Sequence, residues 1–369
     1  MEKILFISNH AGFSKFNKPY IDFLAKNGIK VYNASPGIEV IMNCVQIDIP
    51  VSRNPLSFRN FVSFCKLIKL IRNENILNVH CHTPTGGLIG RFLKLAKPQI
   101  KVIYTSHGFH FFKGAPFYYW VTFFLVELLL APLTHAIITI NNEDYQISKR
   151  FFNKRTYKIN GIGIDLNRFK PNSESKKSGR AKLDINDELF VLIYTAQFIS
   201  RKNHLFLLNA FSKYHQINKN SMLLLLGDGP LEANLKLLVD NLKLSNNVKF
   251  LGYQKNIEYF YQLSDVAISV SKQEGLGMNL VEGLASGLTI VASNIRGHKD
   301  VISQSPGNYL FDLDENCFIE TLCKINPKTL GDDNQIMRNL NSANKFNIQL
   351  SLNEMGKVYS KEFNFQFSD

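Results

Sequence analysis

The chain has 369 residues, of which 45% are hydrophobic and 20% are charged. This length excludes a single small core and suits two α/β domains, and the composition excludes a disordered or fibrous protein. The net charge of +13 lies wholly in residues 1–170, which hold 22 Lys and Arg against 9 Asp and Glu, whereas residues 171–369 hold 21 of each kind. Such a basic half favours nucleic acid, anionic lipid or a phosphorylated acceptor as partner. The simpler explanation of the excess positive charge is that it keeps the protein soluble.

The start of the chain, Met1 to Ser8, predicts a buried strand rather than a signal peptide, because no basic region precedes a long apolar run. The five cysteines are never spaced as Cys-x-x-Cys, which indicates neither a zinc knuckle nor a disulfide framework. We therefore expect a cytoplasmic protein.

Short apolar strands alternate with helical stretches along both halves of the chain. Strands are predicted in the first half at residues 3–8, 78–81, 102–105 and 135–140 and around Val31, with a helix at 18–27, and in the second half at 190–196, 222–227, 248–251, 266–270 and 288–292. This βαβ rhythm predicts two parallel-sheet α/β domains whose ligand sites, at the carboxyl ends of the strands, face each other across a cleft. The expected boundaries are 1–169 for the first domain, 170–186 for a polar linker, 187–334 for the second domain, and 335–369 for a helical tail that packs back on the domains.

Residues 117–133 are the most apolar stretch of the sequence. They are fewer than the roughly 20 residues that a membrane span needs, and they include Glu127 and Pro132, which disfavours a transmembrane helix. A buried helix and an interfacial element both remain open, the latter because aromatic residues cluster beside Lys113 in the basic half.

The loop after the predicted strand 266–270 carries the clearest chemical pattern. Gly275 and Gly277 let the backbone approach a ligand closely, and the helix that follows offers free N–H groups to phosphate. Glu282, eight residues after Glu274, falls in the first turns of this helix, where a carboxylate can accept two hydrogen bonds from a ribose diol. We expect a nucleoside diphosphate here, against the simpler alternative of a loop with two helix-favouring acids.

Two further loops of the second half follow predicted strands. Arg201 and Lys202 come after strand 190–196, where they can neutralise a leaving diphosphate in place of a metal ion; a solvated basic pair is the alternative. Residues 227–230 and 250–253 predict tight turns, and in the latter the backbone of Gly252 and Tyr253 is available to the edge of a base.

In the first half, Gly12 lies in the loop after the first strand and can admit a ligand, but the loop lacks the G-x-G-x-x-G spacing of a dinucleotide site. His107 ends a strand and precedes Gly108, so it can hydrogen-bond a sugar or share charge at a reaction centre, with a structural histidine as the alternative.

The histidines of the first half raise the question of a metal site. His80 and His82 alternate on one strand and so point to the same side, where they could bind a metal ion together with His107 and His110. No carboxylate or thiolate of the usual spacing accompanies them, so we expect no metal. Asp312 and Asp314 are expected to be capping or loop acids.

Eight segments in fixed order carry a family resemblance: HCHTPTGGLIGR (80–91), IYTSHGFHFFKG (103–114), TINNEDY (139–145), GIGIDLNRF (161–169), RKN (201–203), GDGP (227–230), FLGY (250–253) and EGLGMNLVEGLASGL (274–288). With them the chain resembles the retaining family 4 glycosyltransferases of the GT-B fold, especially bacterial members that build capsule, exopolysaccharide or lipid-linked oligosaccharide. The resemblance implies two Rossmann-like domains, the first on the acceptor side and the second binding a nucleotide sugar.

The resemblance also implies roles for individual residues. Glu282 holds the ribose, Lys202 binds the diphosphate, and His107 lies near the donor sugar, while Gly12 belongs to the glycine loop of the first domain. Gln197 stands where the family has an arginine, and Arg201 is the candidate replacement. Glu274 faces the donor sugar and phosphate together with the backbone of Gly275, Leu276, Gly277, Met278 and Asn279.

The implied reaction transfers a hexose or N-acetylhexosamine, with retention and without a cofactor, from a nucleotide sugar to an undecaprenyl-diphosphate-linked saccharide. UDP is the expected nucleotide. The basic first half then matches the acceptor phosphates and an anionic membrane surface, which predicts peripheral association with the inner face of the plasma membrane. Rival predictions are a non-hydrolysing epimerase of the same fold and a non-catalytic partner subunit. Nucleic acid is not expected as a partner, because the second half is neutral and no basic aromatic RNA-binding signature is present.

Overall fold

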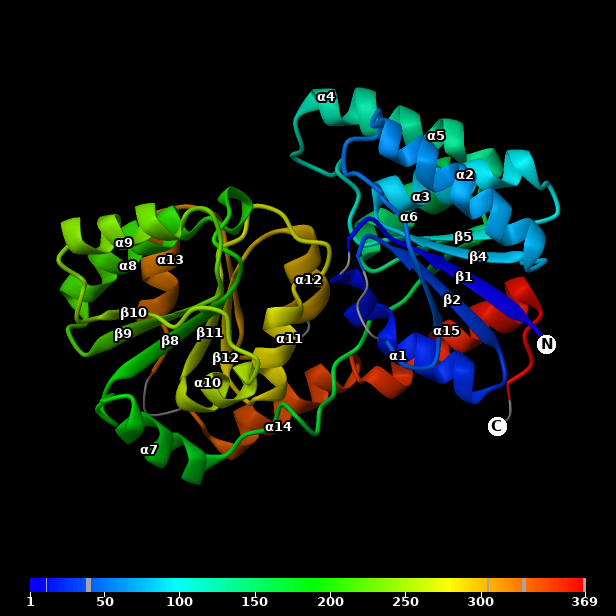
Figure 1. Cartoon of the computed structure of the whole chain (residues 1–369). Coiled ribbons are helices and arrows are strands. Elements are labelled where there is room, and N and C mark those ends of the chain that lie inside the picture. Colours follow the sequence, from blue (N-terminus) through cyan, green and yellow to red (C-terminus); the bar gives the residue numbers. More distant parts are fainter. Residues whose placement is uncertain (11, 38–40, 304, 327–329, 368–369) are drawn as a thin grey trace. The chain divides into compact units, whose positions relative to one another are not determined.

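The computed structural model describes residues 1–10, 12–37, 41–303, 305–326 and 330–367 (Figure 1). The chain divides into two compact units. Unit 1 comprises Met1–Gly163 and Ile348–Asp369, and unit 2 comprises Ile164–Asn347. Each unit is built on one sheet whose neighbouring strands all pair in parallel. The predicted fold class, two parallel-sheet α/β domains, is confirmed.

Unit 1 contains a seven-stranded sheet in the order β3-β2-β1-β4-β5-β6-β7. Its central strands are almost wholly buried because helices cover both faces, which explains their continuous apolar runs. The strands are β1 (Lys3–Ile7), β2 (Lys30–Ser35), β3 (Val45–Asp48), β4 (Asn78–His82), β5 (Lys101–Ser106), β6 (Ala136–Thr139) and β7 (Thr156–Lys158).

Helices cover the two faces of this sheet, with α2, α3 and α5 on one face and α1 and α15 on the other (Figure 1). Glycines bring α3 close to the strands: a Cβ atom at Gly90 would lie 1.9 Å from Sγ of Cys81, and one at Gly87 would lie 2.6 Å from the ring of Tyr104. The helices are α1 (Phe13–Lys26), α2 (Phe58–Asn73), α3 (Pro84–Ala96), α4 (Phe117–Tyr119), α5 (Leu125–Leu130), α6 (Asn142–Phe151) and α15 (Ile348–Phe363).

The apolar stretch 117–133 is a broken helical segment rather than a buried helix. It runs through α4, the π-helix η1 (Trp120–Phe124), α5 and the 3₁₀-helix η2 (Ala131–Leu133). Its one acid, Glu127, is buried and pairs with both terminal nitrogens of Arg91, at 2.6 and 3.2 Å. This ion pair attaches one side of the segment to α3. Large apolar residues on the opposite side are exposed, including Leu129 at 76%. No helix in the described ranges is long and apolar enough to cross a membrane.

Unit 2 contains a six-stranded sheet in the order β10-β9-β8-β11-β12-β13. Its strands are β8 (Phe190–Thr195), β9 (Ser221–Leu226), β10 (Val248–Phe250), β11 (Val266–Ser269), β12 (Thr289–Ser293) and β13 (Tyr309–Phe311). Its helices are α7 (Ser173–Lys182), η3 (Ser200–Lys202), α8 (His204–Ile217), α9 (Glu232–Asn241), α10 (Ile257–Leu263), α11 (Met278–Ala285), α12 (Arg296–Ile302), α13 (Glu315–Cys323) and α14 (Asp333–Asn344).

The structure differs from the expected organisation at the edges of the units. Residues 170–186, expected as a linker, contain α7 and belong to unit 2, where Arg180 bonds Asp265 at 2.8 Å. The tail 335–369 divides between the units, because most of α14 packs on α11 of unit 2 whereas α15 belongs to unit 1. The edge strands β3 and β7 were too short and too polar for the sequence to predict.

Candidate functional site

The strand order of unit 2 reverses beside β8, whose two neighbours are β9 and β11. In an open parallel sheet, the crevice outside the carboxyl ends of the strands at such a reversal is the usual ligand position. The loop after β8 carries Arg201 and Lys202 in η3, and the loop after β11 carries Glu274. The topology therefore brings together side chains about 70 positions apart in the sequence.

Glu274 is the centre of this group. Its carboxylate accepts hydrogen bonds from Nζ of Lys202 and, at 2.7 Å, from the hydroxyl of Ser271. The guanidinium of Arg201 lies 3.4 Å from the other carboxylate oxygen. Tyr194 fixes the surroundings, because its hydroxyl bonds the backbone oxygen of Lys202 at 2.8 Å and the Ser271 hydroxyl at 3.0 Å.

The carboxylate of Glu274 is buried, whereas the guanidinium of Arg201 is partly exposed to solvent. Burial alone would raise the pKa of the Glu274 carboxyl, but the positive charge of Lys202, with a smaller effect of Arg201, holds the pKa below its ordinary value. The carboxylate is therefore ionised and already neutralised by lysine. Half of the Arg201 side chain stays exposed, so its charge is available to an anion.

The backbone from Gly275 to Asn279 turns sharply into α11. Gly277 has φ of +95° and stands at the N-cap of α11, a conformation that side chains other than glycine rarely adopt. Leu276 is buried, whereas Met278 and Asn279 are partly exposed. The start of α11 is therefore partly exposed, and a helix start of this kind can bind phosphate through its amides.

Glu282 lies one turn into α11 and is held by Tyr261. The tyrosine hydroxyl donates to Oε2 of Glu282 at 3.0 Å and is itself 2.6 Å from the hydroxyl of Thr195. Burial raises the pKa of the Glu282 carboxyl to about 7, although Tyr261 and Arg168 act in the opposite direction. Among the described residues no lysine forms an ion pair with this carboxyl, in contrast to Glu274, so it keeps acceptor capacity for a ligand.

The loops after β9 and β10 close around the loop after β8. A Cβ atom at Gly227 would lie 2.1 Å from the carbonyl oxygen of Ala196, so this turn requires glycine. The amide of Gly227 donates to the carbonyl oxygen of Gly252 at 2.9 Å. Gly252 has φ of +66° with open space around it, and Tyr253 is 67% exposed, which leaves this backbone accessible. Gln197 is also exposed.

His298 is a neighbour of this site that the motifs did not reveal. It is fully buried on α12, with Nδ1 2.9 Å from the carbonyl oxygen of Ser293, and a Cβ atom at Gly277 would lie 2.9 Å from its ring. Burial lowers its pKa to about 4, so the ring is neutral and Nδ1–H donates to that carbonyl. The available signal was its place six residues after the predicted strand 288–292, at the carboxyl end of a strand like the other site residues.

The candidate residues of unit 1 lie at the carboxyl edge of its own sheet. Nε2 of His107, after β5, is 3.1 Å from Nδ1 of His82 at the end of β4. Burial lowers the pKa of His107 to about 4, so the pair is uncharged at neutral pH. The loop beyond is held by buried Asp144, which accepts from the Phe109 amide at 2.9 Å. Asp144 was overlooked because its role depends on contacts across two loops.

Gly12 caps α1 with φ of −60°, and its amide donates to Nδ1 of His10 at 3.0 Å. Ala11 of the same loop lies outside the described residues. His80 contacts the hydroxyl groups of Thr105 and Tyr359, both at 2.7 Å, and His110 stacks on Phe123. Within the described ranges, no three His, Cys, Asp or Glu side chains form a group that could hold a metal ion.

The acidic pair late in unit 2 has structural roles, as predicted. Asp314 caps α13 by accepting from the amides of Asn316 and Cys317, and Asp312 accepts from Asn294 at 2.8 Å.

Known proteins resemble both units. Residues 3–141 match the family model of glycosyl transferase 4-like domains, and residues 175–313 match that of glycosyl transferases group 1. The putative glycosyltransferase EpsD of Bacillus subtilis is 32% identical over 97% of this chain and 96% of its own length. The UDP-Gal:alpha-D-GlcNAc-diphosphoundecaprenol alpha-1,3-galactosyltransferase of Escherichia coli is 26% identical over 83% of this chain and 81% of its own length.

Solved structures extend the likeness to the whole fold. HepE of Anabaena, crystallised with UDP and glucose, has a TM-score of 0.80 at 16% identity over 98% of this chain and 100% of that chain. The sucrose-phosphate synthase of Thermosynechococcus elongatus has a TM-score of 0.78 at 19% identity.

Proposed function

This chain belongs to the GT-B glycosyltransferases, and from that premise we propose that it transfers a hexose or N-acetylhexosamine from a UDP-sugar to a lipid-linked saccharide with retention of configuration. The observation that carries the proposal is the group formed by Glu274, Lys202 and Arg201 beside the start of α11. Support for the substrates comes from HepE, which binds UDP and glucose, and from the E. coli relative, which uses UDP-Gal and a diphosphoundecaprenol acceptor.

The donor diphosphate in this proposal lies on the amides of Gly275 to Asn279, opposite the exposed charge of Arg201. Glu282 accepts hydrogen bonds from both ribose hydroxyls, and the backbone of Gly252 and Tyr253 meets the base. Because Lys202 already neutralises Glu274, this carboxylate orients the lysine and the sugar and forms no bond to the sugar.

The chemical step then needs no protein nucleophile. The bond between the anomeric carbon and the diphosphate oxygen breaks, and the acceptor hydroxyl bonds that carbon on the same face. The acceptor proton passes to the departing diphosphate oxygen, whose charge the helix start and Arg201 stabilise. In unit 1, the candidates for contact with a sugar are neutral His107, which can donate a hydrogen bond, and Gly12. No metal ion or cofactor is assigned a role.

A panel of UDP- and GDP-sugars tests this proposal by thermal shift and by hydrolysis of each donor. We expect a UDP-sugar to stabilise the chain and to release UDP slowly, and faster when a lipid-linked saccharide is added. Conversion of the donor alone into another UDP-sugar would instead identify an epimerase. Binding of a donor without turnover by any acceptor fraction would identify a non-catalytic subunit.

Peripheral membrane association is part of the same proposal. The support is the net charge of +13 carried by residues 1–170, together with exposed apolar residues on α4 and α5 such as Phe117 and Leu129. We expect the chain to sediment with anionic vesicles at low salt, and equal binding to neutral vesicles would contradict the electrostatic part of the proposal.

A further inference from the structure

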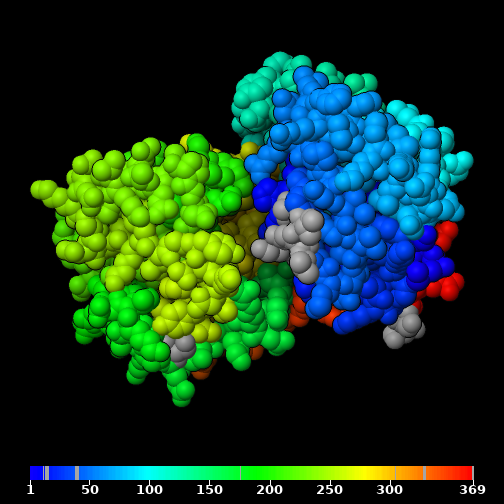
Figure 2. All heavy atoms as spheres, viewed as in Figure 1, coloured from blue at the N-terminus to red at the C-terminus, as the bar shows by residue number. Residues whose placement is uncertain are grey.

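Helices α2 and α3 of unit 1 expose bulky apolar side chains to solvent. Phe58 and Phe61 on α2 are 75% and 58% exposed, and Phe92 and Leu95 on α3 are 39% and 65% exposed. The azure atoms of the α2 region form part of the visible surface of unit 1 in Figure 2. Contiguous apolar surface of this kind marks a binding site more often than it occurs by chance.

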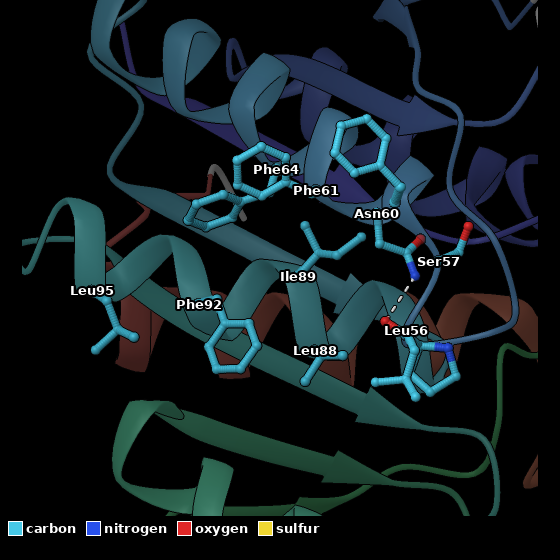
Figure 3. Close-up of a pocket in the computed structure, with 11 residues that line it drawn as sticks. Leu56, Ser57, Asn60, Phe61, Phe64, Leu88, Ile89, Phe92 and Leu95 are labelled. Atoms are coloured by element: carbon cyan, nitrogen blue, oxygen red, sulfur yellow. Dashed lines mark hydrogen bonds between the residues drawn. The ribbon is translucent and has the colours of Figure 1, made fainter.

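These side chains line a groove between the two helices, with a cavity volume of about 610 Å³. Figure 3 shows the lining side chains, which come from α2, from α3 and from the turn before α2. The lining is almost wholly apolar and rich in rings and branched chains; it includes Phe58, Phe61, Phe64, Leu88, Phe92 and Leu95. The volume lies within the usual range of pockets that bind small ligands.

One end of the groove is rigid. Buried Asn60 bonds the carbonyl oxygens of Asn54 and Pro55, at 2.8 and 3.2 Å, and accepts from the amide of Ser52 at 2.9 Å. The hydroxyl of Thr85 donates to the carbonyl oxygen of Arg53 at 3.3 Å, which ties this turn to the start of α3. The groove is therefore formed before a ligand arrives.

This rigid end lies at the carboxyl edge of the sheet. Helix α3 begins directly after β4, and α2 follows β3, so both helices start at that edge and run away from it. His82 ends β4 at the same edge and contacts His107. A chain lying in the groove would thus bring its head group to the edge that carries His107.

The charge around the groove is mostly positive. Residues 45–133 contain ten Lys and Arg and three acids, Asp48, Glu74 and Glu127, of which Glu127 is buried against Arg91. Glu74 follows the far end of α2, where Lys3 and Tyr32 hydrogen-bond it. Arg53 and Arg59 lie beside the rigid end and are exposed. An apolar ligand with an anionic head group complements this arrangement.

We propose that the groove between α2 and α3 binds the isoprenoid chain of a polyisoprenyl-diphosphate acceptor, with its diphosphate at Arg53 and Arg59. This inference rests on the proposed function, since it names the lipid half of the acceptor. The lining of rings and branched side chains suits methyl-branched isoprene units, because such units can make many close contacts with it.

Vesicle binding by the full-length protein tests the groove without relying on sugar transfer. Phosphatidylcholine vesicles carry either undecaprenyl phosphate or dioleoyl phosphatidic acid in equal amounts, so that the phosphate head groups match and only the chains differ. We expect tighter binding to the isoprenoid vesicles by on the order of tenfold, which corresponds to about 1.4 kcal/mol. Equal binding to both vesicles would overturn the proposal.

Two groove variants and one matched control locate the preference. Phe61→Gln together with Phe92→Gln should remove the isoprenoid preference and leave binding to phosphatidic acid vesicles near that of the native chain. Leu95→Gln changes an exposed residue of the groove and serves if the double variant is poorly folded. Leu129→Gln, on α5 outside the groove, should change binding to both vesicles by the same factor. Equal losses on both vesicles by the groove variants would show a general membrane contact instead.

The outcome separates this inference from the proposed function. If the chain transfers no sugar, the isoprenoid preference is still measurable. If the chain transfers sugar but shows no preference, the groove assignment is wrong and the transferase assignment is untouched.

Discussion

Replacement of Glu282 by glutamine tests the electrostatic reading of the donor site. Burial raises the pKa of this carboxyl to about 7, whereas the unfolded chain releases the proton near the ordinary pKa of glutamate, 4.5. Between these values the folded protein binds more protons than the unfolded chain, so its stability falls as the pH rises and the loss is complete above pH 7. The difference corresponds to an upper limit of about 3 kcal/mol at pH 8.

Glutamine keeps the shape of the carboxyl and the acceptor for Tyr261 but removes the buried charge. We therefore expect Glu282→Gln to raise the free energy of unfolding of the ligand-free protein at pH 8, by up to about 3 kcal/mol, and to change it little at pH 4. In calorimetric melts this amounts to on the order of 2–4 °C for each kcal/mol in a unit of this size. Glu232→Gln is the control, because Glu232 pairs with Lys236 at the surface of α9.

UDP supplies the second half of the experiment. Only the ionised carboxyl accepts hydrogen bonds from both ribose hydroxyls, so UDP should stabilise the native chain more at pH 8 than at pH 6 and should stabilise Glu282→Gln weakly at both. A melting-temperature gain that is the same at pH 4 and pH 8 would refute the buried charge. Equal stabilisation of variant and native chain by UDP would refute the ribose contact.

Three further substitutions address the remaining groups. Glu274→Ala should lower kcat/KM by on the order of 100-fold or more in a coupled UDP-release assay while the melting curve keeps its cooperativity; undiminished turnover would remove Glu274 from the mechanism. Arg201→Ala should lower kcat/KM by about tenfold, and adding Gln197→Arg should restore most of it if a charge at either position serves the diphosphate; a double variant as weak as the single one speaks against the replacement. Glu127→Ala should cost about 3–5 kcal/mol in urea unfolding because it leaves Arg91 buried and unpaired, whereas Glu127→Leu with Arg91→Met should cost far less, and equal costs would disprove the pairing argument.

The parts that could be predicted from sequence depend on local pattern or on strand order. Buried strands of a parallel sheet read as apolar runs, and their carboxyl ends meet at one edge, so Lys202 and Glu274 could be placed in one site although they are 72 positions apart. Gly277 could be predicted as a position where the backbone needs glycine, because it lies in the loop between a predicted strand and a helix. These predictions needed the order of the strands and no detail of side-chain packing.

The parts that escaped prediction depend on contacts with no local signature. The approach of His298 to Gly277 and the hydrogen bond from Tyr261 to Glu282 join different loops and helices. The sequence left a buried helix and an interfacial element both open for residues 117–133. The buried pair of Glu127 and Arg91 decides which side of the stretch faces inward, and periodicity cannot show a partner on α3.

The route of the chain through its two units also orders events on the ribosome. Residues 164–347 are contiguous, so unit 2 can fold as soon as they have emerged, whereas unit 1 still lacks α15 and the Tyr359 hydroxyl that bonds His80 at 2.7 Å. Unit 1 is therefore begun first and completed last, and its exposed phenylalanines remain longest in an incompletely folded nascent chain. Residues 348–369 return to unit 1 after unit 2, so unit 1 gains α15 and the hydrogen-bond partner of His80 only once unit 2 has been synthesised.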